Sequence, residues 1–186
     1  MAGGDDLLVL VDVLDQPVGQ AEKLDCHRRH LLHRAFSVFL WRHVDGRTQL
    51  LLQRRALGKY HSGGLWANSC CSHPRVGESL PQAVERRLAQ ELGVTGVVCH
   101  EVGSFVYYAP FANGLAEYEY DHVMVGEYDG DVRPNPDEVM DVRWAFADDL
   151  AGELARDPGS FAAWFITAAP MVLRNLELWQ SARPNN

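Results

Sequence analysis

Two side chains that could do chemistry lie two positions apart in segment 68–74, which reads NSCCSHP. Cys71 supplies a thiol and His73 an imidazole, shortly after the glycine pair at 63–64. Side chains alternate along a strand with a period of two, so an extended segment would point both groups to the same side. A thiol next to a possible metal ligand is rarely needed for packing, and we therefore expect the other functional residues to converge on this pair.

Histidine is concentrated in the same part of the chain. Six of the eight histidines lie between positions 27 and 73, and Glu117 and Glu119 follow later. Imidazoles from His27, His33 and His73, together with these two carboxylates, would suit Mn²⁺, Mg²⁺ or Zn²⁺ with five or six ligands. Two other interpretations stay open. The histidines could be ordinary surface or core residues, or the cysteines at 26, 70 and 71 could form a thiolate zinc site with them, although the tight spacing of a structural zinc site is missing.

Basic residues precede the cysteine segment. Arg54, Arg55 and Lys59 could clamp a phosphate or diphosphate, because guanidinium groups make charge-assisted, bidentate contacts to such anions. A solvated run of surface charges would explain the same three residues. The formal net charge of the chain is −8, so an anionic substrate needs such a local basic cluster, whereas nucleic acid and anionic membranes are not expected as partners.

The segment that begins at Ser79 is the clearest predicted helix, and it must position two further charged groups. Ser79 and Gln82 have the spacing of a capping box, and Gly93 stands where a helix commonly ends. At 100° per residue, an apolar face forms from Leu80, Ala83, Val84 and Leu88. Arg87 and Glu91 fall inside this face. Because unpartnered buried charge is costly, they form either a buried salt bridge or part of a ligand site.

The remaining pattern predicts strands mixed with a few helices. Strands are expected at 7–14, 35–41, 48–52, 101–109 and 117–127 and through 142–144, with a hairpin turn at Asp45-Gly46. Loops are expected at 26–33 (or a single helical turn), 54–66, 110–114 and 134–138, and 148–180 is mostly helical with breaks at Pro158-Gly159 and Pro170. In the strand at 117–127, Glu117, Glu119 and Asp121 share one face. This arrangement indicates a compact α/β or α+β fold.

Length and composition are those of one globular domain. The chain has 186 residues, of which 47% are hydrophobic and 23% charged, and we expect a single domain over 1–186 with flexible ends at about 1–5 and 181–186. The four cysteines show no disulfide spacing and no signal peptide is recognisable, so a reduced cytoplasm is expected. The apolar run around 161–171 is too short to span a bilayer.

Residues 86–93, RRLAQELG, resemble the Nudix box, whose core is R-E-U-x-E-E-x-G with U an apolar residue. The arginine, the apolar position, the last glutamate and the glycine match, whereas Arg87 and Gln90 replace two acidic positions. Nudix hydrolases use that acidic cluster to gather metal ions around a diphosphate and its attacking water. The resemblance therefore implies the fold but argues against hydrolysis.

Together the motifs resemble type 1 isopentenyl-diphosphate Δ-isomerases, a Nudix-fold family. The matching segments are CH at 26–27, LLHRAFSVFL at 31–40, LLLQRRALGK at 50–59, NSCCSHP at 68–74, ELG at 91–93, EYEY at 117–120 and PDEV at 136–139. The similarity runs from about position 7 to beyond 164. It implies an α/β (α+β) Nudix fold with mixed β-sheets between helices. It also implies an isomerase of isoprenoid biosynthesis that interconverts isopentenyl and dimethylallyl diphosphate by a 1,3-allylic proton shift.

The resemblance also implies catalytic roles. It makes Cys71 and Glu119 the acid/base pair on opposite faces of the substrate, and Tyr107 the hydrogen-bond partner of the glutamate. Protonation of the alkene gives a tertiary carbocation, over which the family places the aromatic ring matched by Trp164. Ordinary core packing would also explain this tryptophan. General acid–base steps contribute roughly 10²–10⁴-fold each, so other residues must help.

The family's metal and substrate sites carry over onto matching positions. The first metal site corresponds to His27, His33, His73, Glu117 and Glu119, with Mn²⁺, Mg²⁺ or Zn²⁺ as candidate ions, and a second Mg²⁺ arrives with the diphosphate at Glu91. The diphosphate contacts correspond to Lys23, Arg55, Lys59 and Arg87. His27 and His33 lie one residue closer together than is common in bacterial relatives, which leaves Cys26 and His30 as alternatives for the first ligand.

The resemblance implies a small-molecule prenyl diphosphate substrate, no flavin or nicotinamide, and a monomer or homodimer without nucleic-acid or membrane partners. Two other functions have to be weighed. A Nudix pyrophosphohydrolase would need the acidic cluster that Arg87 and Gln90 interrupt, and it has no need for Cys71. A catalytically idle metal-binding module would be expected to lack one member of the acid/base pair, yet Cys71 and Glu119 are both present.

Overall fold

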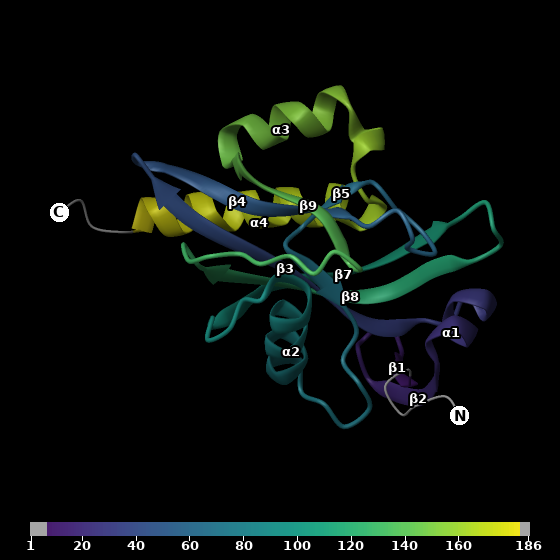
Figure 1. Ribbon diagram of the computed structural model, residues 1–186. Helices are drawn as coiled ribbons and strands as arrows, with labels where there is room; N and C mark the ends of the chain where they lie inside the picture. Colours follow the sequence, from purple (N-terminus) through teal and green to yellow (C-terminus); the bar gives the residue numbers. More distant parts are fainter. Residues whose placement is uncertain (1–6, 183–186) are drawn as a thin grey trace.

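The computed structural model describes residues 7–182, and of residues 179–182 only the backbone. The ends predicted to be flexible lie outside the described residues, apart from the backbone of 181–182. The described chain forms one mixed sheet of nine strands with helices on both sides (Figure 1). The strands are β1 (Leu7–Val11), β2 (Pro17–Glu22), β3 (His33–Val44), β4 (Arg47–Arg55), β5 (Trp66–Ala67), β6 (Cys70–Ser72), β7 (Cys99–Pro110), β8 (Ala116–Glu127) and β9 (Val139–Phe146). The helices are α1 (Lys23–Arg29), α2 (Leu80–Leu92), α3 (Ala147–Arg156) and α4 (Ala163–Ala182), with a 3₁₀ turn at Pro158–Ser160.

β3 is the central strand of the sheet. It pairs antiparallel with β1, β4 and β6 and parallel with β8, while β9 pairs with β4 and β7 with β8. Alternate residues of β3 point into two cores, because Phe39 and Trp41 pack toward α4 whereas Val38 and Leu40 pack toward α2. Since both faces are covered, β3 is a nearly continuous apolar run. The predicted fold, a mixed sheet between helices, is confirmed (Figure 1).

Two local predictions are confirmed because a few neighbouring residues encode them. β3 turns into β4 at Asp45-Gly46, where φ values of 51° and 76° allow a tight hairpin. α2 begins with the predicted capping box between Ser79 and Gln82 and ends at Gly93, whose φ is 65°. Space at position 93 also favours glycine, since a Cβ there would lie 3.1 Å from the Cβ of Arg133 and would make a tight contact.

One other expectation is confirmed in part and one is wrong, and tertiary packing explains both. Of residues 26–33, expected as a loop or a single turn, 26–29 form the last turn of α1, a helix of 7 residues, and 30–32 are not helical. Cys26 and His27 are buried on this helix, so packing stabilises a segment too short to be helical by itself. Pro170 does not break the C-terminal helical region but lies inside α4. The buried face of α4, which includes Ala169, packs in the core and offsets the backbone hydrogen bond that proline removes.

β7 and β8 form a long antiparallel pair that carries the acidic residues. β8 places Glu117, Glu119 and Asp121 on one buried face, as predicted from their alternation. Asp121 accepts a hydrogen bond of 2.8 Å from Ser37 on β3, which ties the acidic face to the central strand. None of the helices in the described part of the chain is both long and apolar enough to cross a membrane.

Candidate active site

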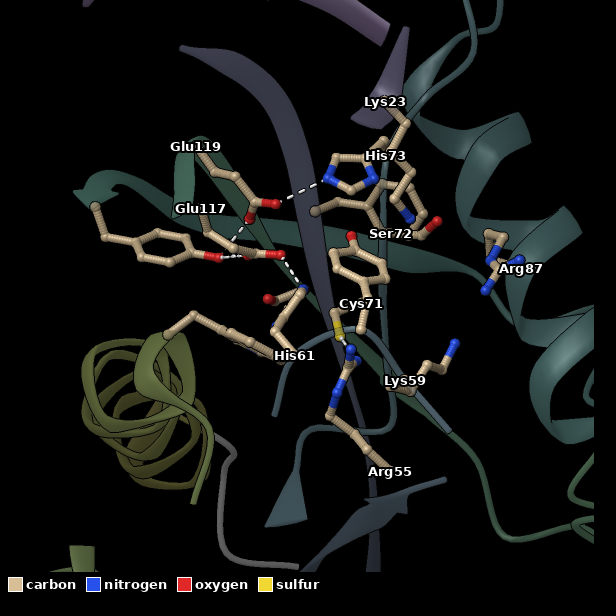
Figure 2. A pocket seen from close by; sticks show the side chains of 15 residues that line it. Lys23, Arg55, Lys59, His61, Cys71, Ser72, His73, Arg87, Glu117 and Glu119 are labelled. Carbon is tan, nitrogen blue, oxygen red and sulfur yellow. Dashed lines mark hydrogen bonds and ion pairs between the residues drawn. The ribbon is translucent and has the colours of Figure 1, made fainter. Parts of the chain in front are cut away.

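A cavity of about 50 Å³ lies where β6 and β8 meet the loop that follows β4 (Figure 2). Cys71 and His73 both line it, as predicted from their spacing, and Ser72 between them also reaches its wall. Other residues singled out in the sequence join them there: Lys23, Arg55, Lys59, Arg87, Tyr107, Glu117, Glu119 and Trp164. The structure therefore brings most of the predicted site residues together around segment 68–74, and their roles stay predictions.

Cys71 is a protonated thiol in this cavity. Burial raises the pKa of the thiol to about 12, although the guanidinium of Arg55 acts in the opposite direction. Arg55 Nη1 donates a hydrogen bond to the sulfur at 3.5 Å, and the same guanidinium lies over the Trp164 ring, 5.1 Å from its centroid. Cys71 thus presents a proton to the cavity.

Glu119 is the ionised counterpart of this thiol. Burial alone would raise the pKa of its carboxyl, but His33, Glu117 and Tyr107 together outweigh burial and lower that pKa to about 2. His73 Nε2 lies 2.8 Å from Glu119 Oε1, and the Tyr107 hydroxyl donates to Oε2 at 2.5 Å. The same hydroxyl also hydrogen-bonds Glu117. Because one hydroxyl hydrogen cannot serve both carboxylates at once, this acidic pair has room for further positive charge.

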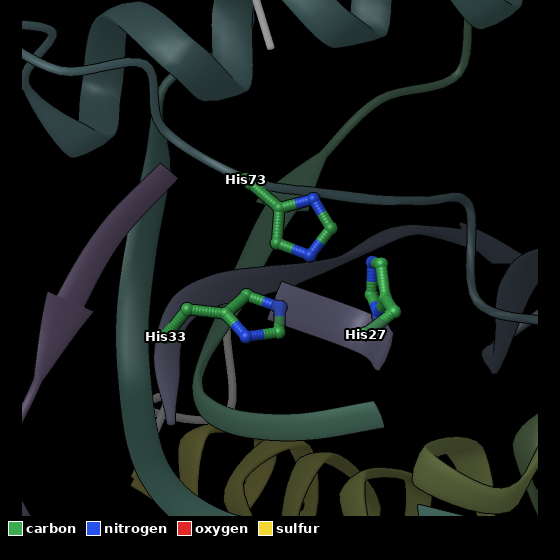
Figure 3. A group of neighbouring side chains, drawn as sticks. All are labelled: His27, His33 and His73. Atoms are coloured by element: carbon green, nitrogen blue, oxygen red, sulfur yellow. The ribbon is translucent and has the colours of Figure 1, made fainter. Parts of the chain in front are cut away.

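Three histidines meet near one point, as Figure 3 shows, and two of them, His33 and His73, approach Glu119. One ring nitrogen from each of His27, His33 and His73 lies within 4.8 Å of the others, and all three residues are buried. His27 Nδ1 donates to the carbonyl of Ala116 at 3.1 Å, and His33 Nδ1 donates to the carbonyl of Leu31 at 2.8 Å. In the neutral rings these bonds place the hydrogen on Nδ1, so Nε2 carries a lone pair that can bind a metal ion.

This donor set fits a divalent cation. His33 Nε2 is buried without a hydrogen-bond partner among the described residues and lies 3.5 Å from Glu119 Oε1. A buried polar atom without a partner requires an explanation, and a cation between this imidazole and the carboxylate would supply one. Imidazole and carboxylate ligands together suit Zn²⁺, Mn²⁺ and similar ions.

The structure distinguishes the alternatives for the first histidine of the cluster. His27 lies in the group with the other two imidazoles. Cys26 is directed to the backbone instead, with its sulfur 3.8 Å from the carbonyl oxygen of Ala21, and His30 is exposed next to Tyr108. Within residues 7–182 no metal-ligand group of this kind contains a cysteine, so the thiolate zinc site has no structural support.

The basic residues gather at a second, wider cavity of about 200 Å³ that shares part of its wall with the first. It is lined by the cations Lys23, Lys59, Arg75, Arg86 and Arg87 and by Glu138. Arg87 forms an ion pair with Glu91, which is 3% exposed and also accepts a hydrogen bond from Gln53 at 3.1 Å. The core-facing Arg–Glu pair is therefore a salt bridge, and its arginine lines both cavities.

Sequence reasoning missed three residues of the site. His61 pairs with Glu117 at 2.5 Å, Tyr60 lines the smaller cavity, and Glu138 forms an ion pair with Lys59. His61 belongs to the histidine-rich window and Glu138 to the PDEV segment, so both carried a signal. Neither signal was sufficient, because the roles of these residues depend on partners far away in the chain.

Comparison with known proteins gives consistent results for sequence and fold. The NUDIX domain family matches residues 31–165. Isopentenyl-diphosphate Delta-isomerase 2 of Photorhabdus laumondii is 45% identical over 177 residues, covering 95% of this chain and 98% of the relative. Isopentenyl-diphosphate Delta-isomerase of Burkholderia multivorans is 47% identical over 161 residues, covering 87% and 89%. Two solved structures share the fold. One is a Deinococcus radiodurans protein, with a TM-score of 0.64 and 22% identity, covering 81% of this chain and 89% of that chain. The other is the MutT protein of Methanosarcina mazei, with a TM-score of 0.62 and 18% identity, covering 78% of this chain and 96% of that chain.

Proposed function

The chain belongs to the NUDIX family and, within it, to the isopentenyl-diphosphate Delta-isomerases, and on this premise we propose how its site performs the reaction. The enzyme interconverts isopentenyl and dimethylallyl diphosphate. We propose that it does so by proton transfers that involve Cys71, the five-carbon chain of the substrate and Glu119.

The observation that carries this proposal is that Cys71 on β6 and Glu119 on β8 line the same small cavity. Burial raises the pKa of the Cys71 thiol, which agrees with a proton donor, and the neighbours of Glu119 lower the pKa of its carboxyl, which agrees with a proton acceptor. Protonation of the terminal alkene carbon yields a tertiary carbocation, and loss of a proton from the carbon on the other side of the cationic centre completes the shift. One group gives a proton while the other takes one, and the roles exchange in the reverse reaction.

Trp164 and Tyr107 support the cation and the carboxylate. Trp164 is buried, and its Nε1 donates to Asn68 Oδ1 at 2.9 Å, which fixes the ring beside the cavity. The face of an aromatic ring attracts a cation within about 6 Å by roughly 0.5–2 kcal/mol. We propose that this ring stabilises the carbocation and that the Tyr107 hydroxyl orients Glu119 through its hydrogen bond.

We also propose that the three histidines hold a divalent cation together with Glu117 and Glu119. The ion, Mn²⁺, Mg²⁺ or Zn²⁺, would supply positive charge that orients Glu119 and adjusts its acidity. His27 and His33 are prepared for this role by the backbone carbonyls that hold their Nδ1 hydrogens. The net reaction moves a proton and no hydride, so neither flavin nor nicotinamide is part of the proposal.

The two adjoining cavities suggest how the substrate lies. We propose that its hydrocarbon end occupies the smaller cavity beside Cys71 and Glu119, and that its diphosphate occupies the wider, basic one. The proposed diphosphate contacts are Lys23, Lys59 and Arg87, which line the wider cavity, and Arg55, which lines only the smaller one beside it. Glu91 lies next to Arg87 and would hold the Mg²⁺ that accompanies the diphosphate.

A pyrophosphohydrolase is the alternative on the same fold. Arg87 and Gln90 stand where the hydrolase motif has acids, and Arg87 in addition pairs with Glu91. The site therefore has fewer carboxylates for a hydrolytic metal cluster, whereas Cys71 has a use only in the isomerisation.

The single domain over 1–186, the monomeric or homodimeric state and the cytoplasmic location stay predictions from the sequence. All four cysteines are free in the structure, which agrees with a reduced compartment.

The experiment that tests the function is proton NMR of the purified protein with isopentenyl diphosphate and Mg²⁺ in D₂O, with phosphate release measured in parallel. The expected result is dimethylallyl diphosphate that carries solvent deuterium, without free phosphate. Phosphate release without the allylic product would move the assignment to the hydrolase. Neither product from folded, metal-loaded protein would favour the metal-binding module.

A further inference from the structure

Glu138 occupies the place where two of the cations proposed to hold the diphosphate converge. Its Oε2 atom forms an ion pair with Lys59 Nζ and lies 3.7 Å from Arg87 Nη2. All three side chains line the wider cavity, and Figure 2 shows Lys59 and Arg87 directed toward one region. A carboxylate oxygen between an ammonium and a guanidinium stands where a phosphate oxygen of the substrate would bind.

The backbone holds Glu138 in this place. Asn135 N donates to the carbonyl of Glu91 at 2.8 Å, which ties the loop before β9 to the end of α2. Ala56 N donates to the carbonyl of Glu138 at 3.0 Å, which ties the same loop to the segment after β4. Glu138 N donates to the carbonyl of Asn135 at 3.0 Å. These backbone hydrogen bonds hold the loop that carries Glu138 against α2 and against the segment after β4.

Each of the two cations beside Glu138 already has a carboxylate partner. Arg87 pairs with the buried Glu91 and also approaches Glu138, while Lys59 pairs with Glu138. A diphosphate that entered alone would have to compete with Glu138 for both cations. It would also bring negative charge close to two carboxylates, and like charges a few ångströms apart in a partly buried site repel each other.

A divalent cation bound together with the diphosphate would supply positive charge beside these carboxylates, which would weaken the repulsion. We infer that Glu138 is a specificity-determining residue that makes diphosphate binding depend on a divalent cation. Glu138 thereby selects the metal complex of the substrate over the free anion. This inference rests on the proposed function, because it takes a diphosphate as the ligand of the wider cavity, and it adds a residue and a selectivity that the acid/base assignment does not contain.

The test measures binding of inorganic diphosphate to the full-length protein by isothermal titration calorimetry, once with Mg²⁺ and once with EDTA. The quantity compared is the ratio of the affinity with Mg²⁺ to the affinity without it. Glu138→Gln keeps the shape of the side chain and removes its charge, so this ratio should fall roughly tenfold or more as the affinity for the free anion rises.

Glu85→Gln is the matched control, because Glu85 is an exposed acid on α2 that lines neither cavity. It removes the same charge from the protein, and its ratio should stay within about twofold of that of the wild type. A change of similar size in this control would mean that net charge alone explains the effect, and would overturn the inference.

An unchanged ratio in Glu138→Gln, with a melting temperature close to that of the wild type, would also overturn the inference. So would a loss of affinity under both conditions, since Glu138 would then only support the structure of the site. Failure of the proposed function has a different signature. Wild-type protein that binds diphosphate with the expected Mg²⁺ dependence but does not convert isopentenyl diphosphate would refute the isomerase mechanism and keep the role of Glu138.

Discussion

Replacement of Cys71 by alanine tests the acid/base pair directly. The change removes the thiol from the cavity wall, while the second member of the pair, Glu119, and the diphosphate contacts Lys59 and Arg87 stay in place. A general acid–base step contributes roughly 10²–10⁴-fold, which corresponds to about 2.7–5.4 kcal/mol of transition-state stabilisation. We therefore expect kcat to fall by at least about 10²-fold while KM changes little.

Cys70 provides a matched control one position away. Its side chain is 0% exposed, packs in the core against α2 and lines neither cavity. Cys70→Ala should therefore lower the free energy of unfolding by about 1–2 kcal/mol through lost packing and leave kcat close to that of the wild type. The contrast between the two alanine variants separates loss of a proton donor from loss of packing.

The assay follows conversion of isopentenyl diphosphate by NMR at saturating substrate, and each variant is also checked for thermal unfolding and bound metal. Cys71→Ala should be folded and should retain its metal, but its kcat should be at least about 10²-fold below that of the wild type. Conversion at more than about a tenth of the wild-type rate would refute the role of Cys71, because an essential proton donor contributes more than that.

The buried groups of the site support three more predictions. Tyr107→Phe removes a hydrogen bond that lowers the pKa of Glu119. The acidic limb of the kcat–pH profile should therefore move to higher pH, and kcat should fall by about tenfold or more. An acidic limb at the same pH as in the wild type would contradict the assigned hydrogen bond. Burial and the charge of Glu119 raise the pKa of Asp121 in the folded protein well above its usual value. In the unfolded chain the pKa of this carboxyl is about 3.9, so the free energy of unfolding should decrease as the pH rises above that value. In metal-free protein, the melting temperature of Asp121→Asn minus that of the wild type, measured by calorimetry, should therefore increase between about pH 4 and pH 8. A difference that stays constant over this range would count against this reasoning. Removal of metal with EDTA should lower the melting temperature of the wild type but not that of His73→Ala. An ion at 100 times its Kd adds about 2.7 kcal/mol to the free energy of unfolding. Equal shifts in the melting temperatures of the two proteins would argue against metal binding at the histidine cluster.

Elements encoded by a few neighbouring residues could be predicted from the sequence. The capping box of Ser79 and Gln82 and the hairpin turn at Asp45-Gly46 depend on local backbone chemistry, and both appear in the structure as expected. The common face of Glu117 and Glu119 follows from the alternation of a strand, which is also a local property.

Features that depend on distant partners could not be predicted in this way. α1 is helical because burial of residues such as Cys26 outweighs a weak local preference. The place of Glu138 in the site depends on Lys59, which is 79 positions away in the chain. No pattern within a short window of sequence contains that relation, since the approach of two distant segments is decided by the packing of the whole sheet.

The sequence by itself determined the kinds of groups that this protein has: thiol, imidazoles, carboxylates and cations, in motifs that resemble one family. Only the tertiary structure decided which of them meet. Parallel pairing of β3 with β8 sets His33 opposite Glu119, and antiparallel pairing of β7 with β8 sets Tyr107 opposite the same glutamate. These registers are held by apolar residues on both faces of β3, because a slip by one residue would turn every side chain of a strand to the other face. The distances in the site are therefore set by the burial of the core, and spacing along the chain does not contain them.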